Sequence, residues 1–168
     1  LEDYRIRHAQ YKADVDSQAM LQQHPLIAVW DDHESSNNSW MEGAENHDPD
    51  EGEGDWPTRR AASVKAYYEW MPIRENRSAR QLQIYRSFRY GNLVDLVMLD
   101  TRLTGRDEQV VPGDNAAVNA PERSLLGGSQ EAWLFGELKE SIDDGTRWRV
   151  LGQQVFFGAQ APSDAIRN

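Results

Sequence analysis

The sequence predicts a layered fold of the α/β or α+β class, in which helices cover a parallel or mixed sheet. Long polar stretches carry apolar residues at helical spacing, and short continuous apolar runs of strand length lie between them. Two of those apolar runs flank Gly91-Asn92, a turn signal typical of an antiparallel hairpin. No internal repeat is visible, so we expect one layered unit.

Three helices are predicted from this periodicity and from the Pro and Gly residues that bound it. Pro25 ends the first helix, Pro57 suits the first turn of the second, and Pro72 closes the second. Ser129 can cap the third helix, and Asp144-Gly145 ends it. The expected helices cover residues 1–24, 59–70 and 129–143.

Four strands are expected, at residues 26–30, 84–90, 93–99 and 148–151. The first and the last are predicted to be buried strands, because continuous apolar runs are typical of strands covered on both faces. The middle two form the predicted hairpin. Residues between 106 and 126 contain Pro and Gly and are expected to be a loop.

Acidic residues outnumber basic ones, 28 Asp and Glu against 18 Lys and Arg, which gives a formal net charge of −10. Binding to a nucleic-acid backbone needs clustered Lys and Arg, so we expect no nucleic-acid-binding surface. The negative net charge is compatible with bound cations. No apolar run approaches the roughly 18 residues of a membrane span, no signal peptide is visible, and nothing indicates an oligomeric state. Cys is absent, so no disulfide framework is expected.

A polar, acidic stretch over residues 34–56 is predicted to be a solvated, mobile loop with weak cation affinity. An EF-hand is excluded, because Glu51 and Pro57 stand where that loop needs Gly and Glu. Trp40 and Trp56 lie in or beside this stretch and are the tryptophans expected to be able to contact a ligand. The other four are expected in the core: Trp30, Trp70, Trp133 and Trp148.

The strongest candidate site is Asp31-Asp32-His33-Glu34, which directly follows the predicted strand at residues 26–30. Ligand sites in open α/β sheets lie beyond the carboxyl ends of strands. Carboxylates suit hard cations, and a His can move a proton near neutral pH. Adjacent residues of an extended chain face opposite sides, so one Asp is expected to bind and the other to orient. The alternative is a solvated turn that Asp31 caps.

Asp100 follows the predicted strand at residues 93–99, so the two acidic strand ends could converge on one site. Asp100 and Arg102 are expected to pair with each other. That pair would either support the site or be a structural ion pair at a strand end.

Six segments in order carry a family resemblance: "WDDHESSNNSW", "GAENHDPD…EGDW", "RRAASVKAYYEWMP", "IYRSFRYGNLVDLVMLDTR", "LLGGSQEAWL" and "WRVLGQQVFF". Together they resemble the PhoD-type alkaline phosphatases, a branch of the metallophosphoesterases. The resemblance implies a two-layer mixed β-sandwich flanked by helices. It also implies hydrolysis of small phosphate mono- or diesters at a cluster of divalent and trivalent metals, calcium with iron. Export to the periplasm or the extracellular space is implied as well.

The resemblance assigns roles to individual residues. Asp32 and Asn38 take the places of metal ligands, His33 takes the place of the catalytic histidine, and Asp31 is expected to be a catalytic residue beside it. Glu34, with Asp100 and Arg102, is expected to orient these groups.

The family's upstream Gly-Asp segment and its downstream Gly-Asp-x-His segment have no counterpart here. We therefore expect residues 1–168 to be the central segment of a single catalytic domain, truncated at both ends and inactive alone. Two alternatives remain open at this point. One is a non-catalytic cation-binding module, and the other is an interaction domain whose acidic loop meets a basic partner.

Overall fold

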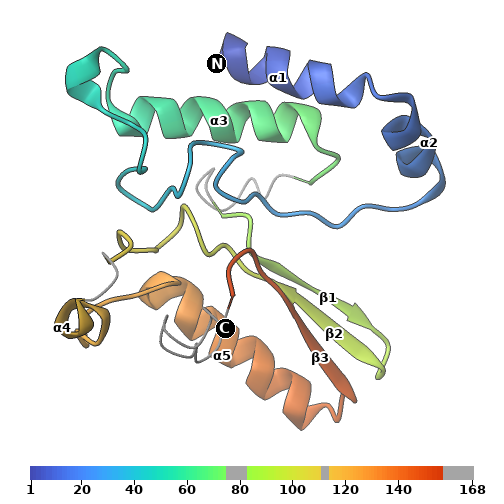
Figure 1. Cartoon of the computed structure of the whole chain (residues 1–168). Helices are drawn as coiled ribbons and strands as arrows, with labels where there is room; N and C mark the ends of the chain where they lie inside the picture. Colours follow the sequence, from blue (N-terminus) through green and yellow to red (C-terminus); the bar gives the residue numbers. More distant parts are fainter. Residues whose placement is uncertain (75–82, 111–113, 157–168) are drawn as a thin grey trace, which may run out of the picture.

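Three helices form one part of the molecule, and a three-stranded sheet with a fourth long helix forms the other (Figure 1). The structure is a computed structural model that describes residues 1–74, 83–110 and 114–156. The first part comprises α1 (Glu2–Lys12), α2 (Val15–Gln23) and α3 (Trp56–Trp70). The second comprises the sheet and α5 (Gly127–Asp143). Irregular segments between the two parts carry the candidate residues.

The helices agree with the predicted ones, with two differences. The first expected helix is divided, because Asp14 caps α2 by accepting a hydrogen bond from the Ser17 N–H at 2.7 Å. The third begins two residues before Ser129, at Gly127, and ends as predicted where Gly145 takes a φ of +70°. Two short helices also occur in expected loops: η1 (Pro49–Glu51) and α4 (Asn115–Val118).

The sheet has the order β1-β2-β3, formed by Arg86–Tyr90, Val94–Met98 and Trp148–Gly152. β1 and β2 are antiparallel and form the predicted hairpin. β2 and β3 are parallel, and α5 connects them in the chain. The predicted mixed α/β class is therefore confirmed, with one sheet among the described residues.

The strand predicted at residues 26–30 is wrong, because this segment pairs with no strand in the described part of the chain. Its last two apolar side chains, Val29 and Trp30, pack in the core cluster under α3 instead. Trp30 is 1% exposed, and its ring lies edge-on to Tyr67 and Tyr68 at centroid distances of 5.6 and 6.1 Å. The apolar run was therefore a sign of burial and not of strand pairing.

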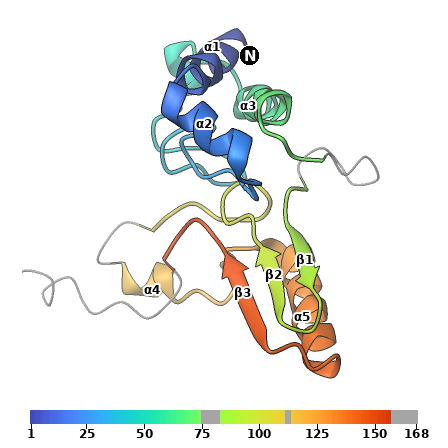
Figure 2. The ribbon, with the colours of Figure 1, turned by 90° about the vertical axis from the view of Figure 1, so that its right-hand side faces the viewer.

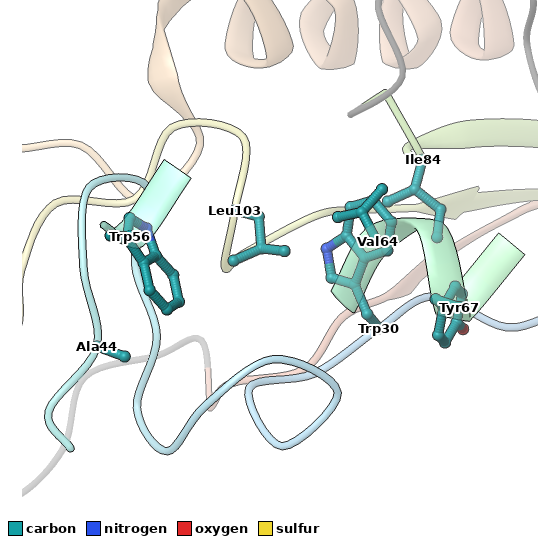
Figure 3. Packing of buried hydrophobic residues seen from close by; sticks show 7 residues of the cluster. All are labelled: Trp30, Ala44, Trp56, Val64, Tyr67, Ile84 and Leu103. Carbon is teal, nitrogen blue, oxygen red and sulfur yellow. The ribbon is translucent and has the colours of Figure 1, made fainter. Parts of the chain in front are cut away.

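The larger core cluster lies under α3 and holds Trp30, Ala44, Trp56, Val64, Tyr67, Ile84 and Leu103 (Figure 3). Trp56 is 4% exposed and belongs to this core, but it also lines a pocket beside Pro57 and Arg60, so its contact with a ligand stays a prediction. Trp40 is half-buried, and its ring covers Gly43, where an added Cβ would lie 2.5 Å from the indole.

Only one face of the sheet is covered by a helix among the described residues (Figure 2). Val97 of β2 packs with Leu134 of α5, and Arg149 of β3 donates to the Ser141 carbonyl at 2.9 Å. Side chains alternate along strands, so the registers place the neighbouring positions on the other face. That open face carries Phe88, Tyr90, Val94, Leu96, Trp148 and Val150.

The open face contradicts the prediction that residues 148–151 are a buried strand. Trp148, Val150 and Leu151 are 65%, 46% and 41% exposed. The physical reason is that, in the described part of the chain, no layer covers the face that carries Trp148 and Val150, and β3 has a neighbouring strand on one side only.

No helix among the described residues is long and apolar enough to cross a membrane.

Candidate active site

A tight turn over residues 31–38 is organised by Asp32. Its carboxylate Oδ2 accepts a hydrogen bond from the backbone N–H of Asn38 at 2.7 Å. Its main-chain carbonyl accepts from the N–H groups of Ser35 and Ser36, both at 2.8 Å. Asn38 has a φ of +48°, in the left-handed region where Asn is enriched among non-glycine residues. The turn therefore places the two predicted cation ligands, Asp32 and Asn38, against each other.

Glu34 closes the same turn from within, because its Oε2 accepts the backbone N–H of Asp31 at 2.6 Å. The alternative hypothesis was a turn capped by Asp31. In the structure Asp32 and Glu34 supply the capping carboxylates, and the Asp31 side chain is left to make another contact.

The second segment follows β2 and is fixed by Asp100, which is fully buried. Its Oδ1 accepts the N–H groups of Arg102 and Leu103, both at 2.9 Å, and its Oδ2 accepts the Thr104 hydroxyl at 2.5 Å. Gln130 of α5 bonds both the N–H and the carbonyl of Asp100 at 2.8 Å. Burial raises the pKa of the Asp100 carboxyl, and these donors oppose that effect.

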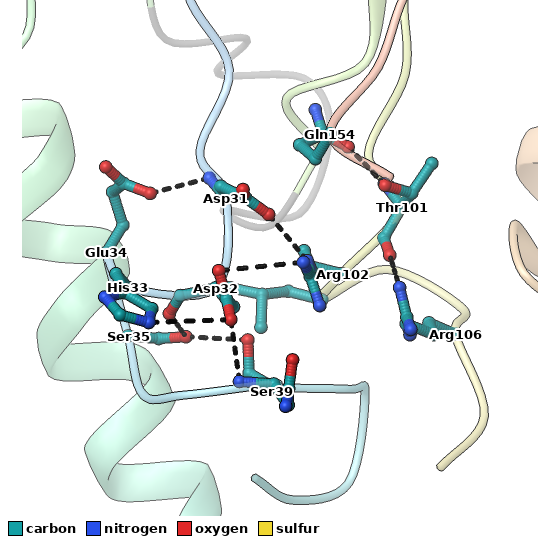
Figure 4. Close-up of polar contacts among 12 residues, drawn as sticks. Asp31, Asp32, His33, Glu34, Ser35, Ser39, Thr101, Arg102, Arg106 and Gln154 are labelled. Carbon is teal, nitrogen blue, oxygen red and sulfur yellow. Dashed lines mark hydrogen bonds and ion pairs between the residues drawn. The ribbon is translucent and has the colours of Figure 1, made fainter. Parts of the chain in front are cut away.

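Arg102 joins the two segments, and the expected Asp100–Arg102 ion pair is wrong. The Asp100 carboxylate accepts from the Arg102 backbone N–H. The Arg102 guanidinium points away from it, toward Asp31 and Asp32 (Figure 4). Its Nε lies 2.7 Å from Asp31 Oδ1, and its Nη2 lies 3.6 Å from Asp32 Oδ1. The two acidic segments therefore converge as predicted, and the Arg102 guanidinium lies between them.

Asp31 and Asp32 were expected to face opposite sides, and the structure brings both to one guanidinium. The reason is that the chain turns here and is not extended. Burial alone would raise the pKa of the Asp32 carboxyl. The Asn38 N–H, the Arg102 charge and His33 outweigh it, so the pKa of Asp32 lies below its ordinary value.

His33 is accessible, with 75% of its side chain exposed. Its Nε2 lies 2.9 Å from Asn37 Oδ1 and 3.9 Å from Asp32 Oδ2. Together with Glu34 it lines one end of a groove of about 810 Å³ between α1, α2 and the segment before the turn. The His33 ring is therefore open to a small ligand and is not part of an apolar core.

The acidic stretch predicted to be solvated and mobile makes several defined contacts. Asp55 caps α3 by accepting the Thr58 N–H at 2.9 Å, and Glu53 pairs with Arg59 at 3.1 Å. Glu45 reaches the 31–38 turn through Asn37 and Asn38. Neither Asn37 nor Glu45 was singled out from the sequence as a site residue, since no spacing rule links them. Mobility of this stretch stays a prediction.

Comparison with known proteins places this chain in a family. The model of the PhoD-like phosphatase family matches residues 1–168. The chain belongs to the PhoD-like phosphatases. It is 41% identical over 167 residues to alkaline phosphatase D of Bacillus subtilis (strain 168), with 94% of this chain and 27% of that protein covered. A solved structure, "Structure of PhoD", superposes with a TM-score of 0.80 at 39% identity, covering 94% of this chain and 30% of that one.

The chain thus spans about a third or less of these PhoD-like relatives. No group of three or more His, Cys, Asp or Glu that could hold a metal occurs among the described residues. Asp32 and Asn38 offer hard oxygen donors, and Asp32 Oδ2 is already bonded to a backbone N–H. A calcium or iron ion needs more donors than these two supply. The described residues fit such a metal only as part of a larger ligand set.

Proposed function

We propose that this chain is the central part of the catalytic domain of a PhoD-like phosphatase that hydrolyses small phosphate mono- or diesters in a metal-dependent reaction. The observation that carries the proposal is the 31–38 turn of a chain that belongs to this family. It holds Asp32 and Asn38 against each other, and its accessible His33 lines a groove together with Glu34.

In this proposal each residue has a separate task. Asp32 and Asn38 provide oxygen ligands to a calcium and iron cluster, which would polarise the phosphoryl oxygens when bound. His33 donates a proton to the ester oxygen as it leaves phosphorus, for which its exposure on the groove is suitable. The Asp31 carboxylate is engaged by Arg102, which supports a role in holding the site over one in proton transfer.

We propose further that other parts of the whole protein complete the site and the fold. The sheet has an open apolar face, and large uncovered apolar surfaces are unusual in stable soluble domains. This favours a second layer in the whole protein that covers the face, as in a two-layer β-sandwich. The 168-residue chain alone is then expected to lack turnover. Export of the whole protein is part of the same proposal, and a leader in the full reading frame would test it.

The proposal is tested on the full-length protein supplied with calcium and iron. Release of phosphate from a simple aryl phosphate ester should depend on the metals and should stop when a chelator is added. Asp32→Ala removes a charged ligand, so metal content should fall together with the rate. His33→Ala removes a proton-transfer group, so metal should stay while turnover falls by roughly 10²–10⁴-fold.

His24→Ala is the matched control for His33→Ala, because His24 is exposed at the end of α2. It should leave both metal content and turnover unchanged. Full activity of His33→Ala would remove the catalytic role of His33. Full activity of the 168-residue chain would contradict the proposal that other parts complete the site.

A further inference from the structure

Glu45, from the acidic stretch, contacts two amide side chains of the 31–38 turn with a single oxygen. Its Oε2 accepts from Asn37 Nδ2 at 2.8 Å and from Asn38 Nδ2 at 2.5 Å. The other end of the Asn37 amide, Oδ1, lies 2.9 Å from His33 Nε2. A continuous hydrogen-bonded path therefore runs from Glu45 through Asn37 to His33.

The chemistry of the carboxylate fixes the direction of every bond in this path. An ionised carboxylate can only accept, so the Asn37 amide must turn its NH₂ group toward Glu45. Its carbonyl oxygen then faces His33, and that oxygen can also only accept. His33 Nε2 must therefore carry a hydrogen and donate it to Asn37 Oδ1. In the neutral ring this leaves Nδ1 as the acceptor.

The path does not hold the turn together by itself. The Glu45 backbone N–H donates to the Asn37 carbonyl at 3.1 Å, and the Ser36 hydroxyl bonds Asn46 Oδ1 at 2.5 Å. These bonds keep the acidic stretch beside the turn whatever side chain stands at position 45. A substitution at Glu45 should therefore change the orientation of the Asn37 amide and leave the backbone in place.

We propose that Glu45 is a positioning residue for His33, acting through Asn37 to fix the tautomer and orientation of the imidazole. A role in the reaction rests on the proposed phosphoesterase function, whereas the effect on the tautomer does not. A general acid or base must present a defined nitrogen to the substrate, and a neighbouring carboxylate–amide pair is a means of selecting it.

The first experiment reads the tautomer directly. The full-length, metal-free protein is labelled with ¹⁵N-histidine, and the ring nitrogens are observed at about pH 8.5, where an ordinary His is neutral. The His33 signals are assigned by their loss in His33→Gln. Wild-type His33 should be the Nε2–H form. Glu45→Ala removes the acceptor of the Asn37 amide, so the ratio of Nδ1–H to Nε2–H should rise about fivefold, the effect of about one net hydrogen bond.

Two further variants make this result specific. Asn37→Ala removes the acceptor of His33 itself and should give the same rise, which keeps the test open if Glu45→Ala folds poorly. Glu51→Ala makes the same truncation in the same stretch, where Glu51 is exposed and makes no side-chain hydrogen bond among the described residues, and it should change nothing. An unchanged His33 tautomer in both Glu45→Ala and Asn37→Ala would overturn the proposal.

The second experiment connects the path to turnover. In the metal-loaded full-length enzyme, Glu45→Ala should lower kcat by roughly 10-fold or more with little change in KM. In an Asn37→Ala background the same change should cost less than about 2-fold, because the path is already broken. Additive losses would contradict action through Asn37. If the wild-type enzyme releases no phosphate, the proposed function fails, and the tautomer ratio still decides the positioning role.

Discussion

Arg102 makes the contact between the two halves of the candidate site, and its removal should be costly. Its side chain is 8% exposed, and that of Asp32 is 12% exposed. Near a protein surface, opposite charges about 4 Å apart attract by about 4 kcal/mol, and desolvation of the buried guanidinium offsets part of this. Asp32 keeps its Asn38 N–H bond, and Asp31 is half exposed. We therefore expect Arg102→Met to lower the free energy of unfolding by about 2–3 kcal/mol at pH 7.

The pH dependence of this loss tests the reason for it. The lowered pKa of Asp32 means that its contribution to stability is present above the ordinary carboxyl pKa and disappears as the pH falls through the lower folded value. The difference between wild type and Arg102→Met should therefore shrink below about pH 4, where the unfolded carboxyl is protonated. Urea unfolding followed by intrinsic fluorescence at several pH values measures both quantities.

Arg106→Met is the matched control, because Arg106 is half-buried, donates to the Thr101 carbonyl at 3.2 Å and makes no ion pair among the described residues. It should cost less than about 1 kcal/mol, the typical value of one hydrogen bond. A loss from Arg102→Met that equals the control, or one that is the same at every pH, would refute the ion-pair reasoning.

Three further outcomes follow from the packing. Gly105→Ala should lower the free energy of unfolding, measured in urea, by about 2 kcal/mol or more, because its Cβ would lie 2.4 Å from the Leu126 carbonyl oxygen. Gly128→Ala is the control: it lies on α5 with open space around it, and it should raise that free energy by up to about 1 kcal/mol. Asp100→Ala should cost about 3 kcal/mol by leaving three donors unpaired, whereas Asp100→Asn, which keeps an acceptor, should cost clearly less. Acrylamide should quench Trp148, measured as the difference from Trp148→Phe, in the 168-residue chain but not in the full-length protein; equal quenching would contradict a covering layer.

The elements with local signals could be predicted from the sequence. The hairpin follows from Gly91-Asn92 between two apolar runs, and α3 follows from Pro57 and an apolar stripe that ends before Pro72. The family resemblance was also readable, because six segments occur in the right order, and the family match confirms it.

The elements that depend on distant partners could not be predicted in the same way. An apolar run reports that side chains are buried, and both a strand and an irregular segment can bury them. Trp30 packs on Tyr67 of α3, a helix that begins more than twenty-five residues further along the chain. A periodic pattern within residues 26–30 cannot predict such a distant contact. The exposure of β3 was missed for the related reason that a short apolar run does not tell whether a second layer covers its face of the sheet.

The candidate site shows the same division between local and distant contacts. The sequence pointed to Asp32, His33 and Asn38, and these three do share one turn, because a capping Asp followed by Ser and Asn is a local arrangement. The Arg102 contact joins positions 71 residues apart, and so it reversed the expected pairing with Asp100.

The acidic stretch gives the clearest reason why composition alone was misleading. Eight carboxylates with few apolar neighbours predict a solvated loop, yet several of them are acceptors for specific donors of the fold. A carboxylate is the one common side chain that accepts without donating, and so it can fix which way a neighbouring amide faces. Such a role cannot be predicted from the net charge or the periodicity of the sequence. It depends on one oxygen of Glu45 lying within hydrogen-bonding distance of Asn37, whose other end meets His33.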